Sequence, residues 1–552
     1  MRKPNVKKRY ILLTALSAFL LWSFTVPQND KYFEILKNLD IFATMYKEVN
    51  ANYVDDINPN TIMETGIDAM LSTLDPYTVY YPEDQIEDVR TENTGQYGGI
   101  GAVIGQKYDN KVMVVMPNKG FAADRAGLKR GDEIISINGI NVANDYDKAS
   151  EYLRGQSASK IDLVVKRAGS EDLVLEVELE KIELPNVPYF GMVSEDVGLI
   201  KLTGFRDKAS REVKSALRAL KKEGAKKVII DLRGNGGGLL NEAVNISNLF
   251  IDKGELVVTT KGKLKEMNAT YKTLNVSTDT DIPVAVLVNS SSASASEIVA
   301  GVMQDYDRGV LIGRKSFGKG LVQRTMPLSY NSQMKVTIAK YYTPSGRCIQ
   351  AIDYSSRNDD GSVGKIADSL KTAFQTSNGR VVFDGGGVDP DFKVDLNSLS
   401  PITISMLEAD LFFRFGNEYL GDVPVIKSAK EFVTTDEMFI AFKTWMSDKE
   451  LSYTSVLQTE VKRFKAAAEE SGELDKVKSQ IEQLEQLVAN NLMADLENNK
   501  DEIKILLKDE FVARTLLEEG RLEASFENDN DVLKAIEVLS NSSQYEKVLK
   551  GS

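Results

Sequence analysis

A serine-rich turn between a strand and a helix, followed by a lysine between two glycines, constrains this chain more than any other stretch. Residues 283–290, PVAVLVNS, are an apolar, β-branched run that predicts a buried strand. Residues 297–306, EIVAGVMQDY, carry apolar side chains at helical spacing. Ser294 therefore lies at a strand-to-helix turn. The first amides of such a helix are unpaired and partly positive, which suits an oxyanion on a carbonyl attacked by the Ser294 hydroxyl.

The base that would activate Ser294 cannot be histidine, because the 552 residues contain none. This excludes a Ser-His-Asp triad and any His-ligated metal site. Lysine is the remaining familiar base, and Lys319 is the best candidate because Gly318 and Gly320 let the backbone approach closely. Lowering a lysine pKa by burial from about 10.4 to about 7 costs roughly 4 to 5 kcal/mol. Gln323 follows on the same face of the expected strand, where its amide oxygen could hold the neutral amine.

Simpler interpretations of these motifs stay open. The segment from Ser294 to Glu297 fits the S-x-x-E capping box, so the serine could simply cap its helix. Residues 313–319, GRKSFGK, fit the G-x-x-x-x-G-K pattern of a nucleotide-binding loop. Glycine at position 320 lacks the hydroxyl that would ligate magnesium, however, and the next residues alternate like a strand where a phosphate loop needs a helix. Lys319 could also be an ordinary surface lysine.

SASASEI and FGKGLVQ, with the lysine 25 positions after the serine, resemble the motifs of the carboxyl-terminal processing proteases. These are serine peptidases that use a Ser-Lys dyad with a supporting glutamine. The resemblance implies that Ser294 is the nucleophile, Lys319 the general base and Gln323 the residue that orients the lysine. It also implies an oxyanion hole formed by the amides of Gly238 and Ala295.

The pattern and the resemblance together predict an α/β multidomain protein. Strand, glycine loop and helix recur in order after residue 185, which indicates a mixed α/β core. The resemblance implies that this core is crotonase-like, with an inserted PDZ domain and a helical carboxyl-terminal extension. The expected domains are a signal peptide or membrane anchor at 1–27, an amino-terminal helical segment at 28–92, the PDZ domain at 93–180, the S41-type protease core at 181–400 with a polar insertion at about 351–387, and the helical carboxyl-terminal region at 401–552.

Two stretches resemble a PDZ domain, namely YGGIGAVIG at residues 97–105 and AGLKRGDEIISING at residues 126–139. Such a domain offers consecutive amides to a terminal carboxylate while the peptide adds as a strand to a sheet edge. The resemblance implies protein or peptide substrates with unstructured carboxyl-terminal tails. The carboxylate-binding loop would consist of Gly98, Gly99, Ile100 and Gly101.

The glycine run of residues 231–238, DLRGNGGG, has two interpretations. The G-x-G-x-x-G fingerprint of a dinucleotide site would need glycine at position 239, which is Leu239. The simpler use is a backbone that offers an amide to an oxyanion. We expect no cofactor and no metal ion.

The amino terminus predicts export. Basic residues between Arg2 and Arg9 precede residues 11–26, a largely apolar run of 16 residues that is short for a membrane span of about 20. The segment is a signal peptide or a membrane tether. We therefore expect an exported protein, either periplasmic or anchored to the membrane and facing away from the cytoplasm.

Charge and helical pattern limit the partners. The net charge of −13 argues against a nucleic-acid surface. After residue 400, apolar residues recur at heptad-like spacing between Glu and Lys. Two alternatives stay open for this apolar stripe: it packs on the protease core, or it makes a homodimer.

The sequence therefore predicts an exported serine endopeptidase that captures an unfolded carboxyl-terminal tail and cuts near it. A non-catalytic PDZ adaptor that binds tails without cutting them is a second hypothesis. A crotonase-like acyl-CoA enzyme is a third, because that fold also builds oxyanion holes at helix ends, but it explains neither the PDZ motifs nor the export signal.

Overall fold

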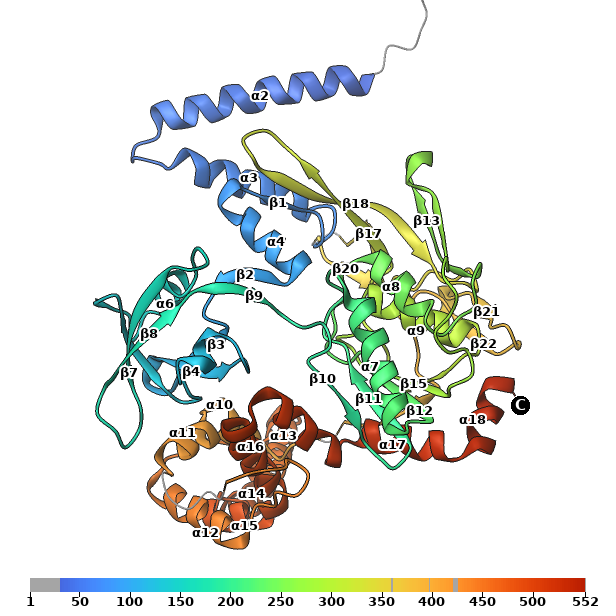
Figure 1. Ribbon diagram of the computed structural model, residues 1–552. Helices are drawn as coiled ribbons and strands as arrows, with labels where there is room; N and C mark the ends of the chain where they lie inside the picture. The colour runs from blue at the N-terminus through green and yellow to red at the C-terminus, as the bar shows by residue number, and fades with distance from the viewer. Residues whose placement is uncertain (1–29, 359–360, 397, 420–424, 552) are drawn as a thin grey trace, which may run out of the picture. The chain divides into compact units, whose positions relative to one another are not determined.

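The computed structural model describes residues 30–358, 361–396, 398–419 and 425–551 (Figure 1). The chain divides into two compact units, one ending at Tyr80 and the other beginning at Tyr81. Residues 1–27, with the export segment predicted at 11–26, lie outside the described residues. Among the described helices, none combines the length and the apolar character that a membrane crossing requires.

The described residues of the first unit form mainly two helices, α2 (Asp30–Asn52) and α3 (Pro59–Ser72). Asn58 caps α3, because its side chain accepts a hydrogen bond from the Asn60 amide at 2.9 Å, and proline occupies the first helical position. Both helices fall within residues 28–92, which are expected from the sequence to be helical.

The second unit begins with helix α4 (Ile86–Thr94) and contains the region expected to be a PDZ domain. Strand β2 (Gln96–Gly99) pairs with β9 (Glu180–Glu183) and so closes this region at its two ends. Between them lies an antiparallel sheet around a core that includes Val114, Ile134 and Leu163. Its elements are β3 (Ala102–Lys107), β4 (Lys111–Pro117), α5 (Ala122–Arg125), β5 (Glu133–Ile137), β6 (Ile140–Asn141), α6 (Tyr146–Tyr152), β7 (Lys160–Lys166) and β8 (Leu173–Glu178).

The α/β region is built on one mixed sheet. In spatial order its strands are β10 (Tyr189–Met192), β11 (Val197–Lys201), β12 (Lys227–Asp231), β15 (Val284–Val288), β16 (Val310–Gly313) and β23 (Phe392–Lys393). Only the β10–β11 pair in this sheet is antiparallel. Every residue of β15 is buried, as expected for a parallel strand that is covered on both faces.

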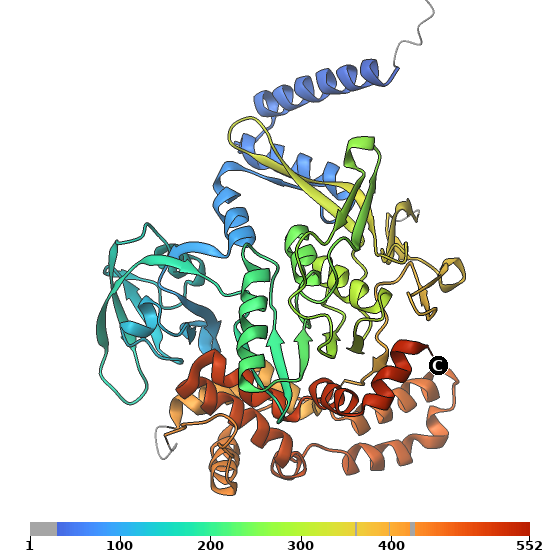
Figure 2. The same ribbon diagram turned by 45° about the vertical axis from the view of Figure 1, so that its right-hand side comes forward.

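Different helices cover the two faces of this sheet (Figures 1 and 2). One face packs on α7 (Ala209–Glu223), α8 (Leu240–Ser247) and α9 (Ala295–Asp305), and Val228 and Ile230 of β12 point to that side. The other face packs on α17 (Asn530–Ser540) and α18 (Ser542–Lys550), and Ile229 points to that side. The last helices of the chain are therefore a layer of the α/β region itself.

A second sheet and several hairpins complete the α/β region. The sheet contains β13 (Leu256–Gly262), β14 (Ala269–Lys272), β17 (Leu321–Pro327) and β18 (Gln333–Tyr342). The stretch predicted as a polar insertion forms short strands, which are β19 (Ile352–Arg357), β20 (Val363–Lys365), β21 (Ala373–Gln375) and β22 (Val381–Phe383).

The remaining carboxyl-terminal helices have a core of their own, with the stacked rings of Phe412 and Phe442 and the buried Phe511. Helices α17 and α18 pack on the α/β region, while a homodimer through the carboxyl-terminal helices stays a prediction. The helices are α10 (Pro401–Glu408), α11 (Leu411–Glu418), α12 (Asp436–Trp445), α13 (Val456–Glu470), α14 (Leu474–Leu487), α15 (Leu492–Asn498) and α16 (Lys500–Ser525).

Candidate active site

Ser294 occupies a strained turn between β15 and α9. Its backbone has φ = 57° and ψ = −112°, a combination that residues with a side chain rarely adopt. The turn is fixed by its surroundings: the Tyr341 hydroxyl donates to the Ser294 carbonyl at 3.1 Å, and the Ala293 amide donates to the Asn235 carbonyl at 3.0 Å. The Ser294 side chain stays partly accessible between buried neighbours. Such strain is common where a nucleophile must be presented in one orientation.

Lys319, two residues before β17, and Gln323, within β17, line the same cavity as Ser294. Gly318 needs its φ of +87°, and a Cβ atom there would lie 2.4 Å from the Cβ of Ala351. Only glycine at position 318 therefore allows the backbone before Lys319 to pass this close to Ala351. The side-chain nitrogen of Gln323 donates to the Thr337 hydroxyl at 3.1 Å, which fixes the orientation of the amide.

Glu297 joins the serine turn to the lysine loop. Its Oε2 accepts the amide hydrogens of Ser294 at 2.8 Å and Lys319 at 2.9 Å, and its Oε1 accepts those of the Gly318 amide at 2.7 Å and the Ser316 hydroxyl at 2.6 Å. The side chain is completely buried. Burial raises the pKa of the Glu297 carboxyl above its ordinary value, and the four hydrogen bonds oppose that rise.

The capping-box interpretation of Ser294 is thus only part of the structure. Glu297 does accept the Ser294 amide, as the box predicts, but the same carboxylate also holds the backbone on both sides of the Gly318–Lys319 bond. From the sequence alone, Glu297 is expected only to cap the helix. The sequence contains one indication that Glu297 does more than cap the helix. It is an acidic residue in the first turn of a helix that is expected to be buried, three positions after Ser294.

Two residues with predicted oxyanion amides, Gly238 and Ala295, line the same cavity as Ser294. Gly237 and Gly238 have φ values of +103° and +142°, and a Cβ atom on Gly237 would lie 3.0 Å from the Ala295 nitrogen. In the part of the chain that the structure describes, neither the Gly238 amide nor the Ala295 amide donates to another protein group. The two amides predicted as oxyanion donors are therefore close to the serine and unpaired, and their role stays a prediction.

We expect Gly237→Ala to lower kcat for peptide cleavage by about 100-fold, because small displacements at a reacting centre can have effects of that size. The new Cβ atom would lie 2.7 Å from the Ala293 carbonyl oxygen and 2.9 Å from the Ser294 Cβ, at a φ that disfavours alanine. Gly236→Ala is the matched control, since a Cβ atom there meets no other atom within 4 Å. Steady-state kinetics of both variants test this, and equal activities would contradict it.

The cavity that these residues share has a volume of about 450 Å³. Gly238, Ala295 and Ser294 line it together with Lys319 and Gln323. Further lining residues are Glu92, Asn93, Gly236, Gly237, Leu239, Leu240, Ile298, Leu321, Val322, Thr325, Lys335 and Tyr341. The sequence-predicted catalytic and oxyanion residues are thus brought together at one accessible cavity.

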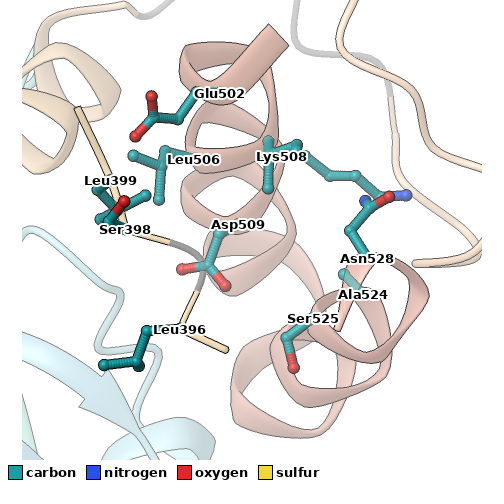
Figure 3. Close-up of a pocket in the computed structure, with 11 residues that line it drawn as sticks. Leu396, Ser398, Leu399, Glu502, Leu506, Lys508, Asp509, Ala524, Ser525 and Asn528 are labelled. Atoms are coloured by element: carbon teal, nitrogen blue, oxygen red, sulfur yellow. The ribbon is translucent and has the colours of Figure 1, made fainter. Parts of the chain in front are cut away.

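A larger cavity of about 630 Å³ lies between α16 and the segment before α10. Figure 3 shows Leu506 and Asp509 of α16 near Leu399 and Leu396. Its lysine, Lys508, is ion-paired with Glu527 at 2.6 Å, so it is not arranged as a base for a nucleophile. The smaller cavity is the one lined by the residues predicted to be catalytic.

The four residues of the expected carboxylate-binding loop lie apart from the Ser294 cavity. Gly98 and Gly99 belong to β2, and a Cβ atom on Gly98 would lie 1.9 Å from the Gly155 carbonyl oxygen. Close packing alone therefore requires glycine there. Ile100 and Gly101 follow, and among the described residues their amides donate to no protein acceptor. Their role in binding a carboxylate stays a prediction.

Over the described ranges, no group of three or more His, Cys, Asp or Glu side chains is placed to hold a metal ion.

Three family models match the chain. The model for peptidase family S41 matches residues 196–355, the PDZ domain model matches residues 113–167, and a model for the C-terminal helical domain of a probable PDZ-protease matches residues 402–539. The Ser294 cavity lies mainly in the first of these ranges.

Curated proteins that match the chain include two proteases. A probable CtpA-like serine protease of Staphylococcus aureus is 36% identical over 347 residues, which is 61% of this chain and 68% of the relative. A carboxy-terminal-processing protease of Bartonella bacilliformis is 34% identical over 57% of this chain and 73% of its own length.

Solved structures that match include a photosystem II D1 C-terminal processing protease, at 26% identity and a TM-score of 0.35. It covers 64% of this chain and 92% of its own. A putative S41 protease from Bacteroides fragilis matches at 16% identity and a TM-score of 0.38, over 72% of this chain and 92% of its own.

Proposed function

Because the chain belongs to peptidase family S41 and is a carboxyl-terminal processing protease of the serine type, we propose that it cleaves polypeptides with a Ser294–Lys319 dyad. This assignment removes the non-catalytic adaptor and the acyl-CoA enzyme from consideration. The PDZ domain and the mixed α/β core with its helical extension are those that the sequence predicts.

Acylation starts at the Ser294 hydroxyl. Neutral Lys319 accepts its proton while Oγ attacks the scissile carbonyl carbon, and the amides of Gly238 and Ala295 stabilise the oxyanion that forms. Collapse of the tetrahedral intermediate breaks the C–N bond, and the protonated lysine gives its proton to the leaving amine. Gln323 orients the lysine throughout.

Deacylation repeats these steps with water. Lys319 accepts a proton from the water molecule that attacks the acyl-enzyme, and the lysine then returns the proton to Ser294 Oγ as the ester bond breaks. The product is a new carboxyl terminus. Metal and cofactor are not needed for any of these steps.

The observation that carries this proposal is the bridge formed by Glu297. One buried carboxylate accepts the backbone amides of both Ser294 and Lys319, so it ties the nucleophile turn to the loop of the base. A surface lysine or a simple helix cap would not require this link. The absence of histidine from the sequence supports lysine as the base.

We further propose that the PDZ domain captures the free carboxyl terminus of the substrate. The unpaired amides of Ile100 and Gly101 support this, because consecutive free amides bind a carboxylate. The basic and apolar segment up to residue 26 supports export, to the periplasm or to the outer side of a membrane.

Tail capture predicts that a peptide with a free carboxyl terminus is cleaved more efficiently than the same peptide with an amidated terminus. The loss of one charge-assisted contact should raise KM by about 10-fold with little change in kcat, because it removes binding that ground and transition state share. Mass spectrometry and steady-state kinetics with the full chain measure this. Equal KM values for the two peptides would contradict carboxylate capture but not the dyad.

A further inference from the structure

Arg233 lies two residues past the end of β12 and contacts three carboxylates. Its Nε and Nη2 donate to the two oxygens of Asp231 at 2.9 and 2.8 Å. Its Nη1 donates to Asp529 and to Asp531, at 2.8 Å in each case. Lys201 adds a second cation, since its Nζ donates to Asp231 at 3.0 Å and to the Arg233 carbonyl at 2.8 Å. The cluster joins a strand of the central sheet to the start of α17.

The cluster is largely buried. The side chains of Asp231, Arg233 and Asp531 are 0%, 14% and 5% exposed. Burial alone would raise the pKa of Asp231, but Lys201 and Arg233 outweigh it and hold that pKa below its ordinary value. Within the described residues, Oδ1 of Asp531 has no hydrogen-bond partner. Burying so many charges is costly even when they are paired, and apolar side chains of similar volume often give equal stability.

Docking of the helix does not by itself explain the two aspartates. Val532, Ala535 and Val538 of α17 are buried against the sheet, so apolar contacts already hold the helix there. Asp529 caps α17, because its Oδ1 accepts the Asp531 amide at 3.0 Å. The same oxygen accepts Nη1 of Arg233. The start of α17 thus determines the positions of the two aspartates, and the aspartates hold the Arg233 guanidinium in place.

Arg233 is the second residue of the loop that leads from β12 to Gly238. Further along this loop, the Gly234 amide donates to the Asn289 side chain at 3.1 Å, and the Gly237 amide donates to the Asn235 side chain at 2.9 Å. The loop is therefore held at successive positions, and the ion cluster holds its beginning. Displacement of Arg233 would be transmitted to the amides beside the nucleophile.

We propose that Asp529 and Asp531 are positioning residues of the active site, which hold Arg233 and thereby set the loop that presents the Gly238 amide. This inference rests on the proposed role of that amide as an oxyanion donor. Both aspartates lie outside residues 196–355, which match the peptidase model, and inside residues 402–539, which match the helical-domain model. The helical region accordingly completes the catalytic centre.

Asp529→Asn and Asp531→Asn, made in the full chain, test the proposal. We expect each to lower kcat for an unstructured free-acid peptide by about 10- to 100-fold and to change KM by less than about 3-fold. Labelling of Ser294 by a fluorophosphonate should slow by a similar factor, because the phosphonyl oxygen would use the same amides. The final amount of fluorophosphonate bound to Ser294 also gives the fraction of each variant that is folded.

Asp436→Asn is the matched control. Asp436 lies in the first turn of α12 and is ion-paired with Lys500 and Lys504, at 3.0 and 3.1 Å, but it does not contact Arg233. Its loss should leave kcat within about 2-fold of the wild type. In an Arg233→Lys background, the Asp529→Asn change should lose most of its effect, because the two residues act as one unit.

Wild-type kcat in both aspartate variants would overturn the proposal, as would an equal fall in Asp436→Asn. If Asp531→Asn does not fold, Asp529→Asn decides, because that side chain is 19% exposed and its replacement by asparagine keeps a good helix cap. Failure of the proposed dyad can be distinguished from failure of the positioning role. It would appear as wild-type cleavage by Lys319→Ala, whereas failure of the positioning role would appear only in the aspartate variants.

Discussion

Lys319→Ala should lower kcat/KM for an unstructured free-acid peptide by about 10⁴-fold, because removal of the general base leaves only the oxyanion donors and binding. Lys319→Arg should be as inactive, since a guanidinium cannot lose its proton in this pH range. The arginine variant separates two roles of the lysine. A base fails in both variants, whereas a purely electrostatic cation would leave Lys319→Arg partly active.

Lys335→Ala is the control for this prediction. Lys335 lines the same cavity, but its ammonium donates to the Tyr81 hydroxyl at 3.2 Å. We expect its replacement to change kcat/KM by less than about 5-fold, since rim charges contribute little to catalysis. Steady-state cleavage assays compare the variants. More than a tenth of wild-type activity in Lys319→Ala would contradict the dyad.

Glu297→Gln should lower both kcat and the free energy of unfolding. A glutamine side chain offers one acceptor oxygen, so its amide group would face backbone N–H groups or the Ser316 hydroxyl that now donate to the carboxylate. Leaving buried donors unpaired is expected to lower the free energy of unfolding by about 2 to 4 kcal/mol. Because the Ser294 turn and the Lys319 loop would then shift apart, kcat should fall by about 100-fold.

Asp145→Asn provides the comparison for Glu297→Gln. Asp145 caps α6, where its side chain accepts the Lys148 amide at 3.0 Å, and asparagine is an equally good cap. Denaturant unfolding and peptide kinetics should therefore detect little change in this variant. A Glu297→Gln protein with wild-type kcat would show that the carboxylate has a role in stability alone.

Most of the candidate active site could be predicted from short motifs in the sequence. The Ser294 turn follows from an apolar run before it and helical spacing after it, and the structure has β15 and α9 in those places. The lysine between glycines precedes a strand, β17, as its alternation predicts. Each feature depends on residues within about ten positions of one another, where steric and hydrogen-bonding rules are strong.

Long-range contacts could not be predicted in this way. Arg233 and Asp529 are 296 positions apart, and no periodic pattern marks an ion pair of that separation. The apolar stripe of the carboxyl-terminal helices left two partners open, because the hydrophobic effect is non-directional. Glu297 was visible as a cap, but its bonds to the Gly318 and Lys319 amides depend on how two loops meet in space.

The measurement that tests the central claim most directly is trapping of the acyl-enzyme with an activated ester of a short apolar acid, followed by an acid quench and mass spectrometry of tryptic fragments. The account predicts an acyl group on Ser294, in the fragment of residues 273–308, in the wild type and not in Ser294→Ala or Lys319→Ala. An acyl group on another residue, or peptide cleavage by Ser294→Ala at the wild-type rate, would contradict the account.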